Sequence, residues 1–185
     1  MIDEIFDEAR DKMEKSVGSL KKELTRIRTG RASLNIFDGV RVNYYGTPTP
    51  LNQIASLSVP ESRLITIQPW DASAIKEIEK AILKSNLGLT PTSDGKIIRI
   101  SIPPLTEDRR KDIVKQVNKI CEDYRVAVRN IRRDANELLK ALKKDGDASE
   151  DAVKKSLDDM QKLTDEHIKQ IDDIFKEKEK ETLEV

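Results

Sequence analysis

The stretch Arg125-Val-Ala-Val-Arg-Asn-Ile-Arg-Arg-Asp-Ala-Asn136 has the periodicity of a long amphipathic helix. In and around it, apolar residues recur at steps of three and four, which predicts one buried stripe: Tyr124, Ala127, Val128, Ile131, Ala135 and Leu138. At about 100° per residue, Arg125, Arg129 and Arg132 fall within an arc of roughly 60° on the flank of that stripe. The stretch therefore combines a packing face with a line of positive charge.

Two interpretations of this arginine line are open. Guanidinium groups bind phosphate oxygens in pairs, so a line of them on a stiff helix suits a nucleic-acid backbone. Arg110 projects near the same flank, and no acidic residue follows Arg129 or Arg132 at the spacing that favours ion pairs along a helix. We therefore expect the line to be unpaired. The alternative is a solvated helix face without a ligand.

The composition indicates long exposed helices rather than a thick globular core. The chain has 185 residues, 37% of them charged and only 4% aromatic, with a formal net charge of +0. That neutrality conceals a polarity, because residues 105–144 carry 12 Lys and Arg against 7 Asp and Glu, whereas residues 145–185 carry 7 against 14. The single cysteine, the acidic amino terminus and the lack of an apolar run of about 20 residues predict a cytoplasmic protein outside the membrane.

Three segments share one helical period, close to a 3.5-residue repeat. We predict helices over residues 2–29, over residues 107–144, and from a cap at Ser149 to about Phe175. The short loop Asp145-Gly-Asp147 makes the second and third helices antiparallel. These segments predict a long antiparallel three-helix bundle formed by residues 1–30 and 105–185.

Residues 31–104 have a different pattern and are predicted to form an inserted β/α/β module, which makes the fold class α+β. Alternating apolar residues predict strands near residues 40–44, 55–59, 64–67 and 98–102, and residues 73–85 a short helix. We interpret the segment from Tyr45 to Pro50 as a turn. The chain crosses between bundle and module twice without a long linker, and the crossings predict a hinge at Gly30, Arg31, Pro103, Pro104 and Leu105.

The residues that enzymes use are sparse. His167 is the only histidine and has no nucleophile near it in sequence, so we expect a structural position at or near the surface. Cys121 is expected to be a packing or surface residue, and Trp70 a core or edge residue of the module. Zinc motifs need several Cys or His residues. We expect no catalytic residues, no metal and no cofactor.

Four motifs, in this order, give the whole chain a resemblance to the bacterial ribosome recycling factors: Arg26-Ile-Arg-Thr-Gly-Arg-Ala32, Val42-Asn-Tyr-Tyr-Gly-Thr-Pro-Thr-Pro-Leu51, Pro103-Pro-Leu-Thr-Glu-Asp-Arg-Arg-Lys111 and Val126-Ala-Val-Arg-Asn-Ile-Arg-Arg-Asp-Ala-Asn136. The resemblance implies a two-domain, L-shaped protein, with the bundle as one arm and the module as the other. It implies a non-enzymatic factor, expected to be monomeric.

The resemblance also implies a partner and a function. Members of this family bind the post-termination ribosome near large-subunit rRNA at the intersubunit face. With elongation factor G and GTP they split it into subunits, which releases mRNA and deacylated tRNA. Arg110, Arg129 and Arg132 match the family's rRNA-contacting positions, and Arg125, Arg133, Arg28 and Arg31 are further candidates. Two other classes stay open, a coiled-coil adaptor without salt-sensitive RNA binding and an enzyme with an unrecognised polar site.

Overall fold

The structure is a computed structural model that describes residues 1–184, and the chain forms two compact units. The helical unit holds residues 1–27 and 108–183, and the module holds residues 28–107 together with Glu184. The described chain contains no helix that is both long and apolar enough to span a membrane.

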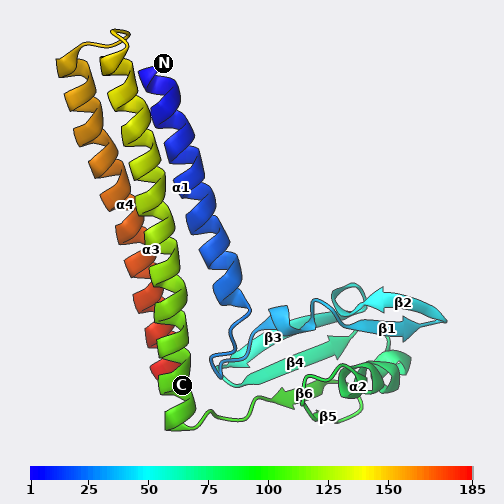
Figure 1. The fold of residues 1–185 in the computed structure, drawn as a ribbon. Helices are drawn as coiled ribbons and strands as arrows, with labels where there is room; N and C mark the ends of the chain where they lie inside the picture. Colours follow the sequence, from blue (N-terminus) through cyan, green and yellow to red (C-terminus); the bar gives the residue numbers. More distant parts are fainter. Residues whose placement is uncertain (185) are drawn as a thin grey trace. The chain divides into compact units, whose positions relative to one another are not determined.

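Three helices lie side by side in the helical unit (Figure 1). They are α1 (Ile2–Thr25), α3 (Glu107–Lys144) and α4 (Glu150–Leu183). The bounds of α3 are those predicted, and the Ser149 Oγ accepts a hydrogen bond from the Ala152 N–H at the start of α4, as the capping pattern predicts. The three-helix bundle and the α+β class are confirmed.

The first helix ends four residues earlier than predicted. At its C-terminus the N–H groups of Arg26 and Ile27 bond to carbonyls three residues back, at 3.2 Å each, and the Thr25 hydroxyl bonds to the Lys22 carbonyl at 2.6 Å. Bonds to the third preceding carbonyl tighten the last turn and terminate the α-helix. The apolar period therefore continues to Ile27 in sequence, but the regular helix does not.

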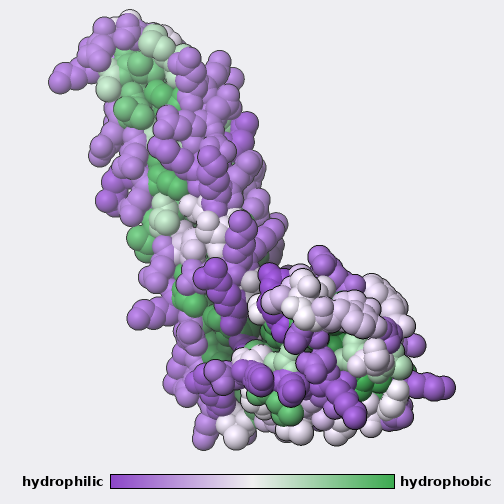
Figure 2. Space-filling model, turned by 90° about the vertical axis from the view of Figure 1, so that its right-hand side faces the viewer, coloured by the Kyte–Doolittle hydropathy of each residue, from purple (hydrophilic) through white to green (hydrophobic). Residues whose placement is uncertain are grey.

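The core of the bundle is displaced from the predicted stripe. On α3 the buried residues are Ile113, Val117, Cys121, Val128, Ala135 and Leu139. Leu138, predicted to be buried, is 52% exposed, whereas its neighbour Leu139 is 0% exposed. Arg125 and Arg132 of α3 both contact side chains of α4, so the buried arc of α3 is turned toward α4 relative to the predicted stripe. In the face seen in Figure 2, hydrophilic side chains cover most of the helical unit, with narrow runs of hydrophobic ones between them.

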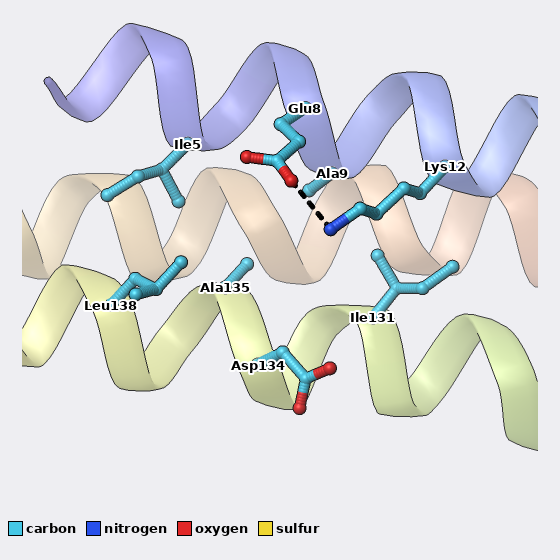
Figure 3. A pocket seen from close by; sticks show the side chains of 8 residues that line it. All are labelled: Ile5, Glu8, Ala9, Lys12, Ile131, Asp134, Ala135 and Leu138. Atoms are coloured by element: carbon cyan, nitrogen blue, oxygen red, sulfur yellow. Dashed lines mark ion pairs between the residues drawn. The ribbon is translucent and has the colours of Figure 1, made fainter.

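Leu138 instead lines a small hollow of about 40 Å³ between α1 and α3. Figure 3 shows Ile5 and Ala9 of α1 facing Ile131 and Leu138 of α3 across it. The Lys12 Nζ pairs with the Glu8 Oε1 at 2.6 Å along its rim. The N-terminal half of α1 therefore leaves this flank of α3 partly uncovered.

The module contains two antiparallel sheets and one α-helix (Figure 1). The two-stranded sheet pairs β1 (Arg41–Tyr44) with β2 (Thr47–Pro50). The second sheet has the order β3-β4-β6-β5 and consists of β3 (Ala55–Glu61), β4 (Leu64–Pro69), β5 (Pro91–Ser93) and β6 (Ile98–Ser101). The helix is α2 (Ile75–Lys84), preceded by a 3₁₀ turn at Ala72–Ala74.

Two strands differ from the predictions. The segment Thr47–Pro50, predicted as part of a turn, is β2, and the turn contains only Tyr45 and Gly46. Prolines are tolerated there because β2 has β1 as its only neighbour, so a missing N–H on the open edge breaks no pairing. Strand β5 was not predicted, since three residues are too few to show an alternating pattern.

The module has a hydrophobic core of its own. It is formed by one face of the four-stranded sheet, the inner side of α2 and the segment before β1, and includes Ile65, Ile67, Ile78, Ile98 and Phe37. Trp70 does not belong to it. This residue follows β4 and is 69% exposed, so of the two predicted positions, core or edge, the core is excluded.

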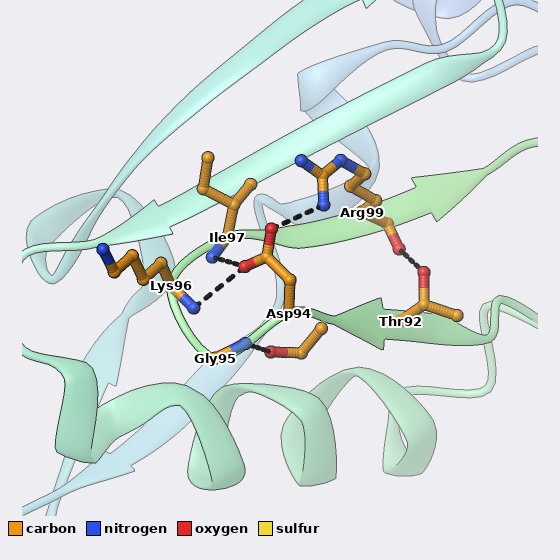
Figure 4. Close-up of polar contacts among 7 residues, drawn as sticks. Thr92, Asp94, Gly95, Lys96, Ile97 and Arg99 are labelled. Carbon is orange, nitrogen blue, oxygen red and sulfur yellow. Dashed lines mark hydrogen bonds and ion pairs between the residues drawn. The ribbon is translucent and has the colours of Figure 1, made fainter.

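The β5–β6 turn is held by one carboxylate (Figure 4). Asp94 Oδ1 accepts hydrogen bonds from the backbone N–H groups of Ile97 at 2.8 Å and Lys96 at 3.0 Å, and Asp94 Oδ2 pairs with Arg99 at 2.9 Å. These bonds, that of Ile97 first, hold the pKa of Asp94 far below its ordinary value. A side chain thus fixes the turn that joins the edge strand β5 to the sheet.

Candidate nucleic-acid interface

Arg125 is a structural tie between α3 and α4 rather than a free cation. Its side chain is only 12% exposed, and its Nε donates to the Asp172 Oδ1 at 2.8 Å while its Nη1 donates to the Glu122 Oε2 at 3.0 Å. Burial opposes the charge, but the two carboxylates outweigh it and raise the pKa of Arg125. The prediction of an unpaired arginine is wrong here, because the acid on α4 lies 47 residues away in sequence.

Arg129 is also paired, although it remains accessible. Its Nη1 lies 3.1 Å from the Glu122 Oε1, and its side chain is 43% exposed. Glu122 thus serves two arginines, and its hydrogen bonds, that from Arg125 first and that from Arg129 second, lower the pKa of Glu122. The acid precedes Arg129 by seven residues, or two helical turns, a spacing that a search for following acids overlooks. The expectation of an unpaired Arg129 is therefore wrong.

Arg132 keeps its charge uncompensated. Its Nη1 donates to the Oε1 of Gln161 on α4 at 2.7 Å, and the Nε2 of Gln161 donates in turn to the Asp165 Oδ1 at 2.8 Å. A neutral amide therefore orients the guanidinium. No carboxylate among the described residues forms an ion pair with Arg132. Within residues 1–184, the exposed Arg133 makes neither a hydrogen bond nor an ion pair.

The remaining predicted site residues lie in different settings. Arg110, near the start of α3, is half-buried and its Nε has no hydrogen-bond partner among the described residues. Arg28 and Arg31 belong to the module and are exposed, and the Arg28 Nη1 donates to the Leu87 carbonyl at 3.4 Å. The helix α3 thus brings Arg110, Arg129, Arg132 and Arg133 onto one rigid element, whereas Arg28 lies in the other unit.

Two features of this surface escaped the sequence analysis. Gln161 orients Arg132 from 29 residues away, and a single sequence contains no signal for that contact. Val126 is 45% exposed on the same side of α3 as Arg129 and Arg133. Its exposure could have been predicted, because at about 100° per residue it lies opposite the buried stripe.

The two predicted crossings touch each other within the module. Gly30 has φ +83°, and a Cβ on it would lie 3.0 Å from the Leu105 Cγ. A side chain at position 30 would therefore meet both a strained backbone and a steric conflict. Pro103 and Pro104 are exposed just before Leu105.

Two further polar residues considered in the sequence, Cys121 and His167, lie in the interior. Cys121 is buried, and burial raises the pKa of its thiol, which makes it unreactive. His167 is buried rather than near the surface as predicted, and its Nδ1 lies 2.8 Å from the Leu163 carbonyl. Among residues 1–184, no cluster of three or more His, Cys, Asp or Glu residues could hold a metal ion. What α3 offers chemically is a set of guanidinium cations, of which Arg132 is oriented by the neutral Gln161.

Known proteins match this chain along its whole length. Residues 20–183 fit the family model of the ribosome recycling factor. Ribosome-recycling factors of Desulfatibacillum aliphaticivorans and Desulforapulum autotrophicum are 63% and 64% identical to it, with 100% of each chain covered.

Solved structures of ribosome recycling factors are similar to this chain as well. A solution structure of a ribosome recycling factor superimposes with a TM-score of 0.75 at 43% identity, covering 100% of this chain and 98% of the other. A model of the T. thermophilus factor, presented with E. coli elongation factor G bound to the E. coli post-termination complex, gives 0.66 at 45% identity, covering 99% of both chains. The chain belongs to the ribosome recycling factor family.

Proposed function

We propose that this protein binds the post-termination ribosome through large-subunit rRNA at the intersubunit face. With elongation factor G and GTP it splits the ribosome into subunits, and mRNA and deacylated tRNA are released. Support comes from family membership and from the related T. thermophilus factor, whose structure is described together with elongation factor G on a post-termination complex. The protein acts in the cytoplasm as a monomeric binding factor and catalyses no reaction itself.

The rRNA-binding surface of the helical unit consists of Arg110, Arg129, Arg132 and Arg133 on α3, and Arg28 is a separate candidate contact in the module. The observation that supports it best is Arg132, whose guanidinium is oriented by the neutral Gln161 and keeps its full charge. A pre-oriented cation loses little entropy when it binds a phosphate. Arg125 is left out of this surface, since two carboxylates already occupy it.

The two-domain division also belongs to this proposal. Its boundaries are those predicted from the sequence, with residues 1–30 and 105–185 in the bundle domain and residues 31–104 in the inserted domain. The compact units of the structure count residues 28–30 and 105–107 with the module. Gly30, Arg31, Pro103, Pro104 and Leu105 act as the hinge between them. The contact of Gly30 with Leu105 supports this assignment, because the two crossings are close together in space.

The variants Arg132→Ala and Arg133→Ala test the rRNA surface. Each should weaken co-sedimentation with ribosomes by roughly tenfold, because one charge-assisted bond is lost. Each should also reduce the slope of log affinity against log salt by about 1 per lost phosphate contact. Binding is measured at two salt concentrations.

Lys169→Ala is the matched control. It also removes an exposed positive charge that has no partner in the described chain, but this charge lies on α4 instead of α3. It should bind as the parent does. If Arg132→Ala and Arg133→Ala bind with the parent's affinity and salt slope, the arginines are a solvated face. If the affinity of the parent protein does not change with salt concentration, the result would favour the alternative function of a coiled-coil adaptor.

A further inference from the structure

Tyr45 occupies a backbone position that disfavours tyrosine. It has φ +50°, and Gly46 after it has φ +82°, so the two form the two-residue turn between β1 and β2. Turns with positive φ at both positions favour Asn, Asp or Gly at the first one. The Tyr45 side chain is 79% exposed, so burial does not account for it either. Neither the packing of the module nor the backbone of the turn requires a tyrosine at this strained position. Backbone strain of this kind points to a functional role.

The Tyr45 ring is nevertheless held in one orientation. Its hydroxyl donates to the Asp71 Oδ2 at 3.0 Å. Its ring also lies edge-to-face with that of Tyr44, with centroids 4.6 Å apart and planes at 72°. The exposed aromatic surface is therefore presented in a fixed direction, which lowers the entropy cost of binding a partner there.

Asp71, which holds the Tyr45 ring, carries a charge that nothing neutralises. Its Oδ1 accepts from the Ser73 N–H at 2.9 Å and the Ser73 hydroxyl at 2.7 Å. Within residues 1–184 it forms no ion pair. The bonds from Ser73, followed by that from Tyr45, lower the pKa of Asp71, so the group is anionic at neutral pH. A hydrogen bond from the Tyr44 hydroxyl lowers this pKa further, so the carboxylate is held by neutral donors.

A second exposed aromatic residue is the neighbour of Asp71 in the sequence. Trp70 directly precedes Asp71 and is 69% exposed. An uncompensated carboxylate beside exposed aromatic rings suits an arginine side chain, whose guanidinium stacks on a ring and donates to the carboxylate. A nucleic acid is disfavoured, because the carboxylate repels phosphate.

We propose that Tyr45, Asp71 and Trp70 form a docking site for an arginine side chain of a protein partner. The site lies in the module and uses none of the arginines of α3. It therefore stands independently of the rRNA-binding surface.

The test uses the full-length protein and its only tryptophan. Trp70 fluorescence is titrated with an acetylated peptide of alternating glycine and arginine, with the matching lysine peptide, and with a short uridine oligonucleotide. A saturable change with the arginine peptide is expected, weaker with the lysine peptide because ammonium groups stack poorly on rings. Asp71→Asn should weaken arginine-peptide binding by about tenfold, the effect of one lost charged contact.

Tyr45→Asn separates recognition from folding. Asparagine suits the turn, so thermal unfolding of the module should occur at the parent's temperature or above it, while peptide binding falls. Glu61→Gln, at the opposite end of the β3–β4 hairpin from Trp70, is the control and should bind as the parent does. The proposal is overturned if the parent shows no saturable change, if both site variants bind like the parent, or if the oligonucleotide binds more tightly than the arginine peptide.

Discussion

At the scale of single residues, Arg125 and Arg132 show how one residue type serves two purposes on one helix. They lie two turns apart on α3 and both reach α4. Arg125 meets the carboxylate of Asp172, and Arg132 meets the amide of Gln161. A carboxylate neutralises the guanidinium, whereas an amide only orients it. The residue on the neighbouring helix therefore determines which arginine stabilises the bundle and which remains available to a ligand.

Stability should distinguish the two. Arg125→Ala should lower the free energy of unfolding by about 1–2 kcal/mol, because two charged hydrogen bonds and a buried side chain are lost. The expected loss of free energy is small because the side chains of Asp172 and Glu122 are 44% and 52% exposed, so solvent screens both ion pairs. Arg132→Ala should cost no more than about 0.5 kcal/mol. Urea unfolding followed by circular dichroism at 222 nm measures both, and equal losses would contradict the distinction.

At the scale of elements, α3 shows what the periodicity of a sequence does and does not fix. Steps of three and four predict that one side of the helix is buried, and that is confirmed. The centre of the buried arc depends on where the neighbouring helices lie, since both Leu138 and Leu139 fit an apolar period. The structure buries Leu139 fully, while Leu138 lines the hollow against α1.

Alanine substitutions should report this displacement. Leu139→Ala should cost about 2–5 kcal/mol, because it leaves a cavity in a packed core. Leu138→Ala, the same chemical change one residue earlier, should cost about 0.5 kcal/mol or less. The free energies of unfolding come from urea titrations of the two variants and the parent. If Leu138→Ala lowered the free energy of unfolding more than Leu139→Ala, the core would lie along the stripe predicted from the sequence.

At the scale of the whole molecule, the chain builds two cores and joins them by two short crossings. The buried residues of the module core run from Phe37 to Ile100, and the buried residues of α1, α3 and α4 form the core of the bundle. Gly30 and Leu105 meet where the chain leaves and re-enters the helical unit. Changes at that point should affect the joint function of the two units more than the affinity that either unit supplies.

Gly30→Ala tests this expectation. The alanine would have a positive φ and a Cβ 3.0 Å from the Leu105 Cγ, so the crossing must distort. Ribosome affinity should stay within a few-fold of the parent's, because the arginines of α3 are untouched. Subunit splitting with elongation factor G and GTP, followed by light scattering, should slow markedly.

Gly18→Ala is the control for this substitution. Gly18 lies in α1 with open space around its would-be Cβ, so alanine should be neutral or stabilise the helix by up to about 1 kcal/mol. Splitting by this variant should match that of the parent. If Gly30→Ala splits ribosomes at the parent's rate, the crossing is only a joint between two folding units.

The sequence by itself determined the features that depend on local spacing. These are the three helices with one shared period, the bounds of α3, the α+β class and the motifs that mark the family. It also placed Arg125, Arg129 and Arg132 on one flank of a helix, because angular position on a helix follows from residue number alone. Whether that flank binds rRNA stays a prediction.

Only the tertiary structure decided what each of these residues meets. Asp172 and Gln161 approach α3 from 47 and 29 residues away, and Tyr45 reaches Asp71 across 26. Two prolines lie in β2, which its single neighbour permits, and Trp70 lies in solvent at the end of β4. The physical reason is common to all of them. Charge compensation, burial and strand pairing are properties of pairs of residues, and folding brings those pairs together from distant parts of the chain.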